Sequence, residues 1–434
     1  MSSHVSLKVL IVGGGIGGPA LAFWLAQLGH DVTIVERNSC LRAQGQQIDI
    51  RGQGVSVIRL MGLEPEIRAR GVDEAGIRFV DHNGKIQAAF GANKTGVGRQ
   101  SFTSEFEIMR SDLVRLLFER TEELGVKYIF GNSVVAFEQD TESVTVSLSD
   151  GTTDKFDLLV GADGQSSRTR RLMLGSGEED PFFPLDLHTA LFTVPREKSD
   201  VNWATVCLAP KQRMMMTRND NPETTQVYLG FAPQDQETDR LLRQSQKGRD
   251  IGEQKRLWIE LFKDAGWQVP RFTKSLEAGG VSDDFYQYQI GQVKMDKWYK
   301  NRVVLLGDAG YGPSPLTGSG TTLAFVGAYV LAGEISEHCA GSKGKMGVSA
   351  ALKAYDSSLR PFVKTVQDIK FKPTALYPKS AWGVSFVNTI LWLVAIFRID
   401  KLFLRLQSDN VEGWNLPDYP ALPVKEGKSD TETD

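Results

Sequence analysis

The N-terminal pattern of apolar and glycine residues predicts a β–α–β unit. Residues 5–12 (VSLKVLIV) are almost continuously apolar and run into a glycine-rich turn, as buried parallel strands do. The Ala- and Leu-rich stretch from Pro19 to Leu28 predicts a helix that stops at Gly29. Residues 31–36 (DVTIVE) predict a second strand. Because the connection is one helix, the two strands are expected to be parallel.

The pattern then predicts more elements of the same kind and a region of different texture. Residues 107–125 have leucines at helical spacing and predict an amphipathic helix. Between about 180 and 290, short alternating runs predict an antiparallel sheet with one covered face. A polar stretch, 234–256, then leads into a helix at 256–267. Strands are predicted at 127–130, 134–139, 143–151, 156–164 and 302–310, and a buried helix at 323–335.

These elements predict a discontinuous first domain with a second domain inserted into it. The expected boundaries are 1–178 and 281–373 for the first domain, 179–280 for the second, 374–423 for a C-terminal helical segment and 424–434 for a disordered tail. Residues 75–100 are a segment that could join the second domain. The fold class expected is α/β, with a parallel sheet and an inserted antiparallel sheet.

Composition excludes several classes of protein. The chain has 434 residues, 41% of them hydrophobic, and a net charge of −3, so it has no basic excess for nucleic acid. Its three cysteines are scattered and form neither a disulfide framework nor a zinc pattern, which favours a reducing compartment. No signal peptide is evident at the N-terminus, so the cytoplasm is the expected location.

A dinucleotide fingerprint occupies the first turn. Gly13, Gly15 and Gly18 form G-x-G-x-x-G between strand and helix. These glycines permit the tight turn, the approach of a pyrophosphate and close helix packing, while the helix N-terminus favours the negative charge. Glu36 ends the second strand, where it can bind a ribose diol, and Arg37 follows it. The fingerprint alone does not distinguish FAD from NAD.

Two further glycine turns end predicted strands, at 161–164 (GADG) and at 307–310 (GDAG). With them the chain resembles the single-component FAD-dependent aromatic hydroxylases, which have the fold of p-hydroxybenzoate hydroxylase. The resemblance covers about residues 8–361. It implies a Rossmann-type FAD-binding domain, an inserted substrate domain and C-terminal helices.

The resemblance implies roles for residues of the second and third turns. Asp163 lies in the motif that contacts FAD and reduced nicotinamide in that family. Asp308 would bind the ribityl chain and Pro315 would lie beside the flavin ring. Backbone N–H groups of the segment that includes Gly318, Gly320 and Thr321 would face the pyrimidine edge. The chain departs from the family at Tyr311, where His is usual, and at Thr322, where Asn is usual.

Other segments extend the resemblance. Arg110 matches an arginine that grips FAD near its phosphate and ribityl region, although an exposed arginine at a helix start has the same spacing. Residues 41–54 (LRAQGQQIDIRGQG) are similar to tetracycline-inactivating flavin monooxygenases. There the acid matching Asp49 touches FAD, and the arginine matching Arg42 lies where NADPH acts. Asp49 alternates with Ile48 and Ile50, so it is expected on the opposite face of a strand.

The implied activity is that of an NAD(P)H-using monooxygenase. No second G-x-G-x-x-G is present, so NADPH or NADH is expected to dock transiently. In the family, dioxygen then forms a flavin C4a-hydroperoxide that oxygenates an electron-rich substrate, here a hydrophobic aromatic or polyketide-like molecule. The flavin carries this chemistry, so no catalytic side chain is assigned. The alternatives are an FAD-dependent reductase or dehydrogenase of an isoprenoid lipid, and a non-catalytic FAD-binding sensor.

Three residues of the second domain are candidate substrate contacts. His188 could face the substrate or be a hydrogen-bonded sheet histidine. Arg213 matches a substrate-contacting arginine of the tetracycline-inactivating relatives, or it faces solvent. Met215, between two other methionines, could supply an adaptable apolar wall, and alternation places only about half of the three on the substrate side.

An uncharged apolar segment, 381–397, lies near the C-terminus and is followed by the basic residues 398, 401 and 405. Three interpretations remain open for it. It is a core helix that covers the substrate domain, a peripheral membrane contact through 381–405 with basic anchors, or a short membrane span.

Overall fold

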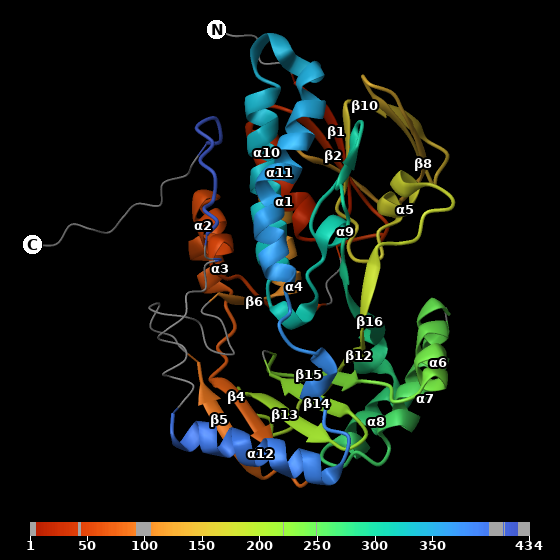
Figure 1. The fold of residues 1–434 in the computed structure, drawn as a ribbon, viewed down its shortest axis with the longest axis vertical. Helices are drawn as coiled ribbons and strands as arrows, with labels where there is room; N and C mark the ends of the chain where they lie inside the picture. Colours follow the sequence, from red (N-terminus) through yellow and green to blue (C-terminus); the bar gives the residue numbers. More distant parts are fainter. Residues whose placement is uncertain are drawn as a thin grey trace, which may run out of the picture.

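Two sheets built from distant parts of the chain organise the protein, as Figure 1 shows. The computed structural model describes residues 6–41, 45–92, 106–219, 221–248, 250–398, 411 and 413–423. One sheet lies in the upper half of the view and the other in the lower half. The long strands β12 and β16 and the end of α11 connect the two halves.

The upper sheet is a six-stranded Rossmann-type sheet. Its strand order is β17 (Tyr299–Lys300), β18 (Val303–Leu305), β11 (Leu158–Gly161), β1 (Lys8–Val12), β2 (Asp31–Glu36) and β7 (Lys127–Phe130). All neighbours are parallel except β17 and β18. The predicted β–α–β unit is confirmed, with α1 (Gly17–Gln27) between β1 and β2. The apolar residues of β1 are buried because helices and strands cover both faces of the sheet.

The lower sheet has seven strands and is mostly antiparallel. Its order is β16 (Tyr286–Val293), β12 (Phe182–Pro195), β15 (Thr224–Phe231), β14 (Arg213–Arg218), β13 (Ala204–Ala209), β4 (Gly76–Val80) and β5 (Ile86–Gly91). The strands β4 and β5 come from the segment 75–100, and β4 joins β13 in parallel. This sheet therefore draws on three separate stretches of sequence.

Two smaller sheets complete the strands. One contains β8 (Val134–Gln139), β9 (Val144–Leu148) and β10 (Thr153–Phe156), and the other is a ribbon of β3 (Gln47–Asp49) and β6 (Glu107–Met109). The predicted helix at 107–125 is wrong at its start, because residues 107–109 pair with β3. The helix α4 (Arg110–Glu123) begins only after this pairing ends, and Arg110 is its first residue.

Helices cover the sheets in two groups. The first group is α1, α2 (Gln53–Leu60), α3 (Glu64–Ala69), α4, α5 (Arg168–Leu174), α9 (Asp308–Tyr311), α10 (Gly320–His338) and α11 (Val348–Gln367). The second is α6 (Gln236–Lys247), α7 (Ile251–Phe262) and α8 (Val269–Ala278), which pack against the lower sheet. The polar stretch 234–256 is thus not a connecting loop: Asp235 caps α6 through the backbone N–H of Thr238, at 2.8 Å.

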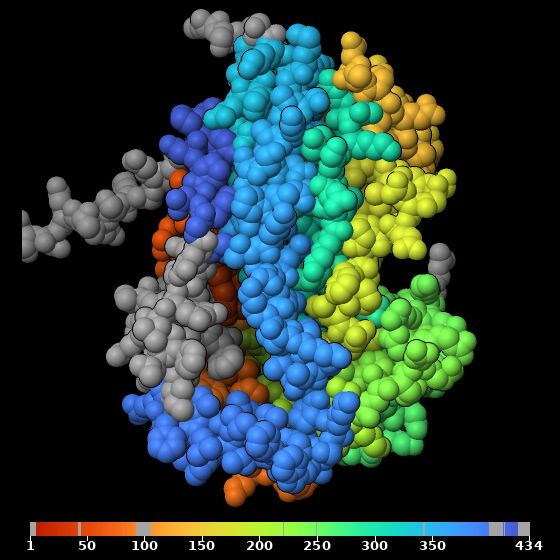
Figure 2. Space-filling view, viewed as in Figure 1, coloured from red at the N-terminus to blue at the C-terminus, as the bar shows by residue number. Residues whose placement is uncertain are grey.

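Four short 3₁₀ turns lie between the longer elements, at Gly280–Asp284, Pro315–Thr317, Gly341–Gly347 and Pro373–Leu376. The last helix, α12 (Ala381–Ile396), follows the fourth of these turns. It contacts β5 and β13 and forms the lower edge of the molecule in Figures 1 and 2. Only Asn388 of this helix is buried, so the expectation of a core helix is wrong. Among the helices that the structure describes, none is both long and apolar enough to cross a bilayer.

The packing of α1 on β1 generates a prediction. A Cβ on Gly18 would lie 2.1 Å from the carbonyl oxygen of Gly13, whereas a Cβ on Gly17 would meet nothing closer than 3.6 Å. Gly18→Ala should therefore force the helix away from the strand at a cost of about 1–3 kcal/mol, and Gly17→Ala should be tolerated. Thermal unfolding of the two variants tests this, and equal Tm values would contradict it.

Candidate cofactor and substrate site

The three glycine turns meet at one edge of the upper sheet. They follow β1, β11 and β18, which are neighbours in the strand order and parallel to one another. Parallel strands end on the same side, so the turns lie together although they are about 150 residues apart in sequence. This edge is where ligands bind in folds of this kind.

The first turn has the backbone geometry that a bound pyrophosphate requires. Gly13 adopts φ +111°, and a Cβ there would lie 2.5 Å from the carbonyl oxygen of Ala162 in the second turn. Space above Gly15 is open except for Nη2 of Arg110, 3.5 Å from a Cβ at that position. Glu36 accepts a hydrogen bond from the N–H of Gly14 at 2.8 Å, so its carboxylate lies beside the turn. These residues fit a dinucleotide with Arg110 near its phosphates.

The third turn holds a carboxylate that is exposed on the cofactor edge. Asp308 begins α9, and the surrounding protein raises its pKa while the charge of Arg110 lowers it. The carboxylate lies between the backbone of Gly312 and that of Gly320, where added Cβ atoms would be 3.4 and 3.8 Å from Oδ1. An exposed carboxylate in this position can accept hydrogen bonds from the hydroxyls of a ribityl chain. Pro315 is exposed at the start of a 3₁₀ turn, and Gly320 and Thr321 open α10.

The structure gives Asp163 a different set of contacts from those expected. Its carboxylate accepts hydrogen bonds from Ser167 Oγ, from the N–H groups of Arg168 and Thr169, and from Thr169 Oγ1, at 2.5–3.1 Å. Both oxygens are therefore directed to the start of α5. Asp163 therefore stabilises the turn next to Gly13. This position does not agree with the prediction that its carboxylate contacts a cofactor.

The remaining residues predicted near the cofactor occupy different environments. Arg37 is exposed just beyond Glu36. Arg42 lies outside the described residues. Asp49 is half-buried on β3: its Oδ2 binds Arg51 at 3.0 Å, and its Oδ1 has no hydrogen-bond partner. The same Oδ2 lies 3.9 Å from a Cβ built on Gly318. Asp49 therefore faces the loop predicted to bind the flavin ring, as alternation with Ile48 and Ile50 requires.

Both departures from the family pattern have structural partners. The hydroxyl of Tyr311 pairs with that of Tyr355 at 2.8 Å, and Tyr355 donates to the carbonyl of Leu305 at 3.2 Å. Tyr311 fits because Gly327 faces it without a side chain. Thr322 Oγ1 donates to the carbonyl of Arg51 and accepts from its N–H. Tyr311 thus links α9 to α11, which in turn bonds the end of β18, and Thr322 links the start of α10 to the segment after β3.

The structure places the three candidate substrate residues on the wrong face of the lower sheet. His188 hydrogen-bonds Asp239 of α6 at 2.8 Å, and burial lowers its pKa. Arg213 is 2% exposed, pairs with Asp264 and donates to the carbonyls of Pro210 and Leu261. Met215 lies in the core under α7 and α8. These positions do not agree with the prediction that the three residues contact substrate, because their side chains lie on the face of the sheet that α6, α7 and α8 cover.

The opposite face carries residues that the sequence analysis missed. Met214 and Tyr288 pack against the same apolar cluster as Leu316, which belongs to the predicted flavin loop, so this face is directed toward the cofactor edge. Tyr286 stacks on Tyr288, with ring centroids 6.1 Å apart. The alternation of Tyr and Gln in residues 286–290 (YQYQI) was a visible signal. By the same alternation, Met216, Gln226 and Tyr228 lie on this face.

A buried ion cluster joins this face to the β3–β6 ribbon. Arg218 of β14 pairs with Glu74 at 2.8 Å and also with Glu107 of β6. Burial, together with the charges of Asp49 and Glu74, raises the pKa of Glu107 to about 8, although Arg218 lowers it. The cluster therefore holds the ribbon, with Asp49, against the lower sheet.

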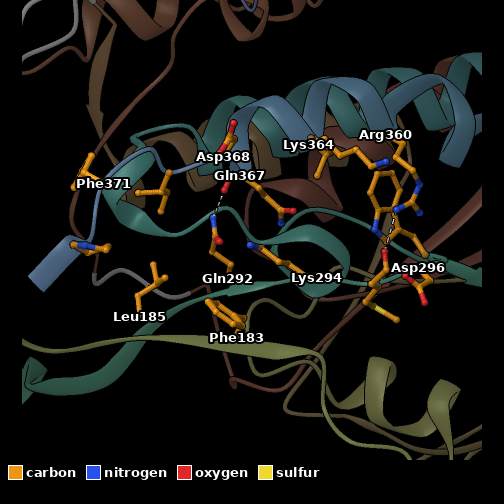
Figure 3. A pocket seen from close by; sticks show the side chains of 15 residues that line it. Phe183, Leu185, Gln292, Lys294, Asp296, Arg360, Lys364, Gln367, Asp368 and Phe371 are labelled. Atoms are coloured by element: carbon orange, nitrogen blue, oxygen red, sulfur yellow. Dashed lines mark hydrogen bonds between the residues drawn. The ribbon is translucent and has the colours of Figure 1, made fainter.

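A cavity of about 550 Å³ lies on the other side of the flavin loop, between β12, β16 and the end of α11 (Figure 3). Gln292 in its wall donates to the carbonyls of Pro313 and Gln367, at 2.9 and 2.8 Å. Gln367 in turn donates to the carbonyls of Val293 and Tyr311. None of the residues predicted to bind cofactor or substrate lines this cavity.

Comparisons with known proteins agree with this geometry. A family model described as an FAD binding domain matches residues 6–370. The FAD-dependent monooxygenase asL4 of Sarocladium schorii is 41% identical, over 96% of this chain and 99% of its own length. The flavin-dependent monooxygenase eupH of a Phoma species is also 41% identical, over 97% of this chain and 99% of its own.

Solved structures show the same fold. The tetracycline destructase Tet(55) has a TM-score of 0.74 and 29% identity, with 96% of this chain and all of that chain covered. An HpxO enzyme of Klebsiella pneumoniae, solved with FAD and uric acid, has a TM-score of 0.66 at 19% identity. The chain covers nearly the full length of its relatives and has their cofactor edge. It therefore belongs to the FAD-dependent monooxygenases.

Proposed function

We propose that this monooxygenase uses NADPH or NADH and dioxygen to oxygenate a hydrophobic aromatic or polyketide-like small molecule. The observation that supports the proposal is the position of the predicted flavin loop. Leu316 in that loop packs against the same apolar cluster as Met214 and Tyr288, so the cofactor edge borders an apolar and phenolic sheet surface. Such a surface suits an aromatic ligand. A tetracycline destructase and an enzyme solved with uric acid have the same fold.

In this proposal the chain binds and orients FAD through groups from the first and third turns and from the elements beside them. The N–H groups around Gly13, Gly15 and Gly18 and the guanidinium of Arg110 hold the phosphates. Glu36 binds the adenosine ribose and Asp308 the ribityl hydroxyls. The roles of the other cofactor residues follow from their positions near the ring: Asp49, Pro315, Gly318, Gly320 and Thr321.

The protein's own contribution to the reaction is placement and exclusion of water. FAD, when bound and reduced, would supply the oxygen-transfer chemistry. The N-terminus of α10, where Gly320 and Thr321 lie, carries positive partial charge and would stabilise negative charge on a reduced flavin held there. The lower sheet closes the other side of the site, which keeps solvent from the reacting atoms.

The role of Asp308 can be tested by removing its carboxylate. Asp308→Ala should weaken FAD binding by roughly tenfold or more, because hydrogen bonds from ligand hydroxyls to a charged carboxylate contribute about 1.5–3 kcal/mol. Fluorescence titration of the apoprotein with FAD measures this. Glu237→Ala, in the exposed ion pair of α6 with Arg240, is the control and should leave FAD affinity unchanged. Full FAD occupancy and normal turnover in Asp308→Ala would remove the assigned role.

The reaction class can be tested on the FAD-loaded enzyme by stopped flow. Anaerobic NADPH or NADH should bleach the flavin bands, faster when an aromatic substrate is present. Oxygen should then give the absorbance of a C4a-hydroperoxide before the oxidised spectrum returns. Reoxidation without that absorbance, across a panel of aromatic compounds, would favour the reductase alternative. Absence of any reduction by either nucleotide would favour the sensor.

We also propose that α12 binds the surface of an anionic membrane. Large apolar side chains on this helix are exposed, including Trp382 at 76% and Ile396 at 54%. The helix contains no acidic residue, and Lys372, Lys379 and Arg398 are exposed at its two ends. Aromatic side chains with flanking cations are typical of helices that lie in a lipid headgroup layer.

Vesicle co-sedimentation tests the membrane contact. The enzyme should bind phosphatidylcholine vesicles that contain phosphatidylserine more strongly than vesicles of phosphatidylcholine alone. The double variant Trp382→Ser, Phe386→Ser should lose most of this binding. Met346→Ser is the control, because Met346 is 80% exposed but lies outside α12. Equal binding by both variants, or loss of a dimer instead of vesicle binding, would contradict the proposal.

A further inference from the structure

Gln47 is a buried residue whose side chain has no hydrogen-bond partner among the described residues. It begins β3 and is 6% exposed. Neither Nε2 nor Oε1 of its amide is hydrogen-bonded. A second buried glutamine, Gln53, has the same exposure but binds the carbonyls of Val411 and Trp414 and the N–H of Val411. The amide of Gln53 is therefore hydrogen-bonded within the protein, whereas the amide of Gln47 is not.

The register of the β3–β6 ribbon shows where Gln47 points. Ile48 pairs with Ile108, and both pack on the main core. Side chains on a strand alternate between faces, so Gln47 and Asp49 share the opposite face. Asp49 Oδ1, on that face, also has no partner. Unpartnered polar atoms therefore gather on the side of the ribbon turned away from the core.

Neighbouring contacts place Gln47 between the flavin loop and the lower sheet. Two residues later, Asp49 lies against Gly318 of the loop. One residue earlier, Gln46 donates a hydrogen bond to the hydroxyl of Tyr286 on β16. Met109, directly opposite Gln47, accepts a contact from Gln226 of β15 through Sδ at 3.3 Å. Asp49 is thus beside the flavin loop, and Gln47 lies where the ribbon meets β15 and β16 of the lower sheet.

A buried amide with both ends unpaired is unfavourable, since each lost hydrogen bond to water is left uncompensated. A ligand that supplies both partners removes this cost when it binds. An amide offers a donor and an acceptor side by side, and its complement is a carbonyl adjacent to an N–H or O–H, as in a lactam or a hydroxy-carbonyl edge.

We propose that Gln47 determines substrate specificity by binding such a donor–acceptor edge of the substrate. The inference rests on the proposed function and refines it, because it restricts the aromatic substrate to compounds with that edge. A site built to hydrogen-bond an N–H or O–H discriminates strongly against an analogue without it, since the amide acceptor is then buried unpaired.

The first arm of the test needs no substrate and uses the FAD-loaded enzyme. Gln47→Leu replaces the amide by an apolar group of similar size. Its Tm should equal or exceed that of the parent, because no bond of the substrate-free enzyme is lost. Gln53→Leu is the matched control and should lower Tm, because it loses three hydrogen bonds. The FAD dissociation constant of Gln47→Leu should stay within about twofold of the parent value.

The second arm uses two probes of nearly identical shape, 2-quinolone and coumarin. Both present a ring carbonyl, but coumarin has oxygen where 2-quinolone has the adjacent N–H. Titration followed by the flavin absorbance should show the parent binding 2-quinolone on the order of tenfold more tightly. In Gln47→Leu the two constants should become equal within about twofold.

Each other result overturns the proposal. A lower Tm for Gln47→Leu would show that the amide has a structural partner, and a tenfold loss of FAD affinity would make it a flavin contact. A parent enzyme that does not favour 2-quinolone over coumarin would exclude the assigned edge. These readings do not depend on turnover, so they are separate from a failure of the monooxygenase reaction in stopped flow.

Discussion

The structure depends on the close approach of backbone to backbone where the carboxyl ends of β1, β11 and β18 meet. Gly13 touches the carbonyl of Ala162, and Gly18 touches the carbonyl of Gly13, so neither position has room for a side chain. Since hydrophobic strands on both sides fix this edge, the N–H groups of the turns are held in place before any ligand arrives. The rest of the site is arranged around that fixed point.

The sequence was sufficient for this part of the fold because its signals are local. Each glycine turn follows its own apolar strand, and the parallel order of the strands then brings the turns together without further information. The error at residues 107–109 had a different cause. Those residues have helical spacing, but the pairing of Glu107 with Asp49 takes them into a strand. A partner almost 60 residues away overrode the local preference.

The lower sheet contains a choice between two faces that local sequence signals could not make. In the run RMMMTR of β14, alternation separates Arg213 and Met215 from Met214, but it does not state which set faces the cofactor. That choice depends on α7, which covers one face and supplies the carbonyl of Leu261 to Arg213. The buried guanidinium of Arg213, with these partners, stabilises the lower sheet on its helix-covered face. The family resemblance pointed to β14, and the side chain that it named, Arg213, lies on the helix-covered face of that strand.

Polar groups inside the protein are divided between two uses. Those that join the halves are satisfied by protein: Arg218 is held by two carboxylates, and Gln292 by two carbonyls behind the flavin loop. Gln47 and Asp49 lie within the same junction, yet each keeps an unpartnered polar atom. Unpaired buried atoms also occur elsewhere among the described residues, for example Nε2 of Gln289, but Gln47 and Asp49 place three of them on one face of one ribbon beside the flavin loop, where a ligand would satisfy them.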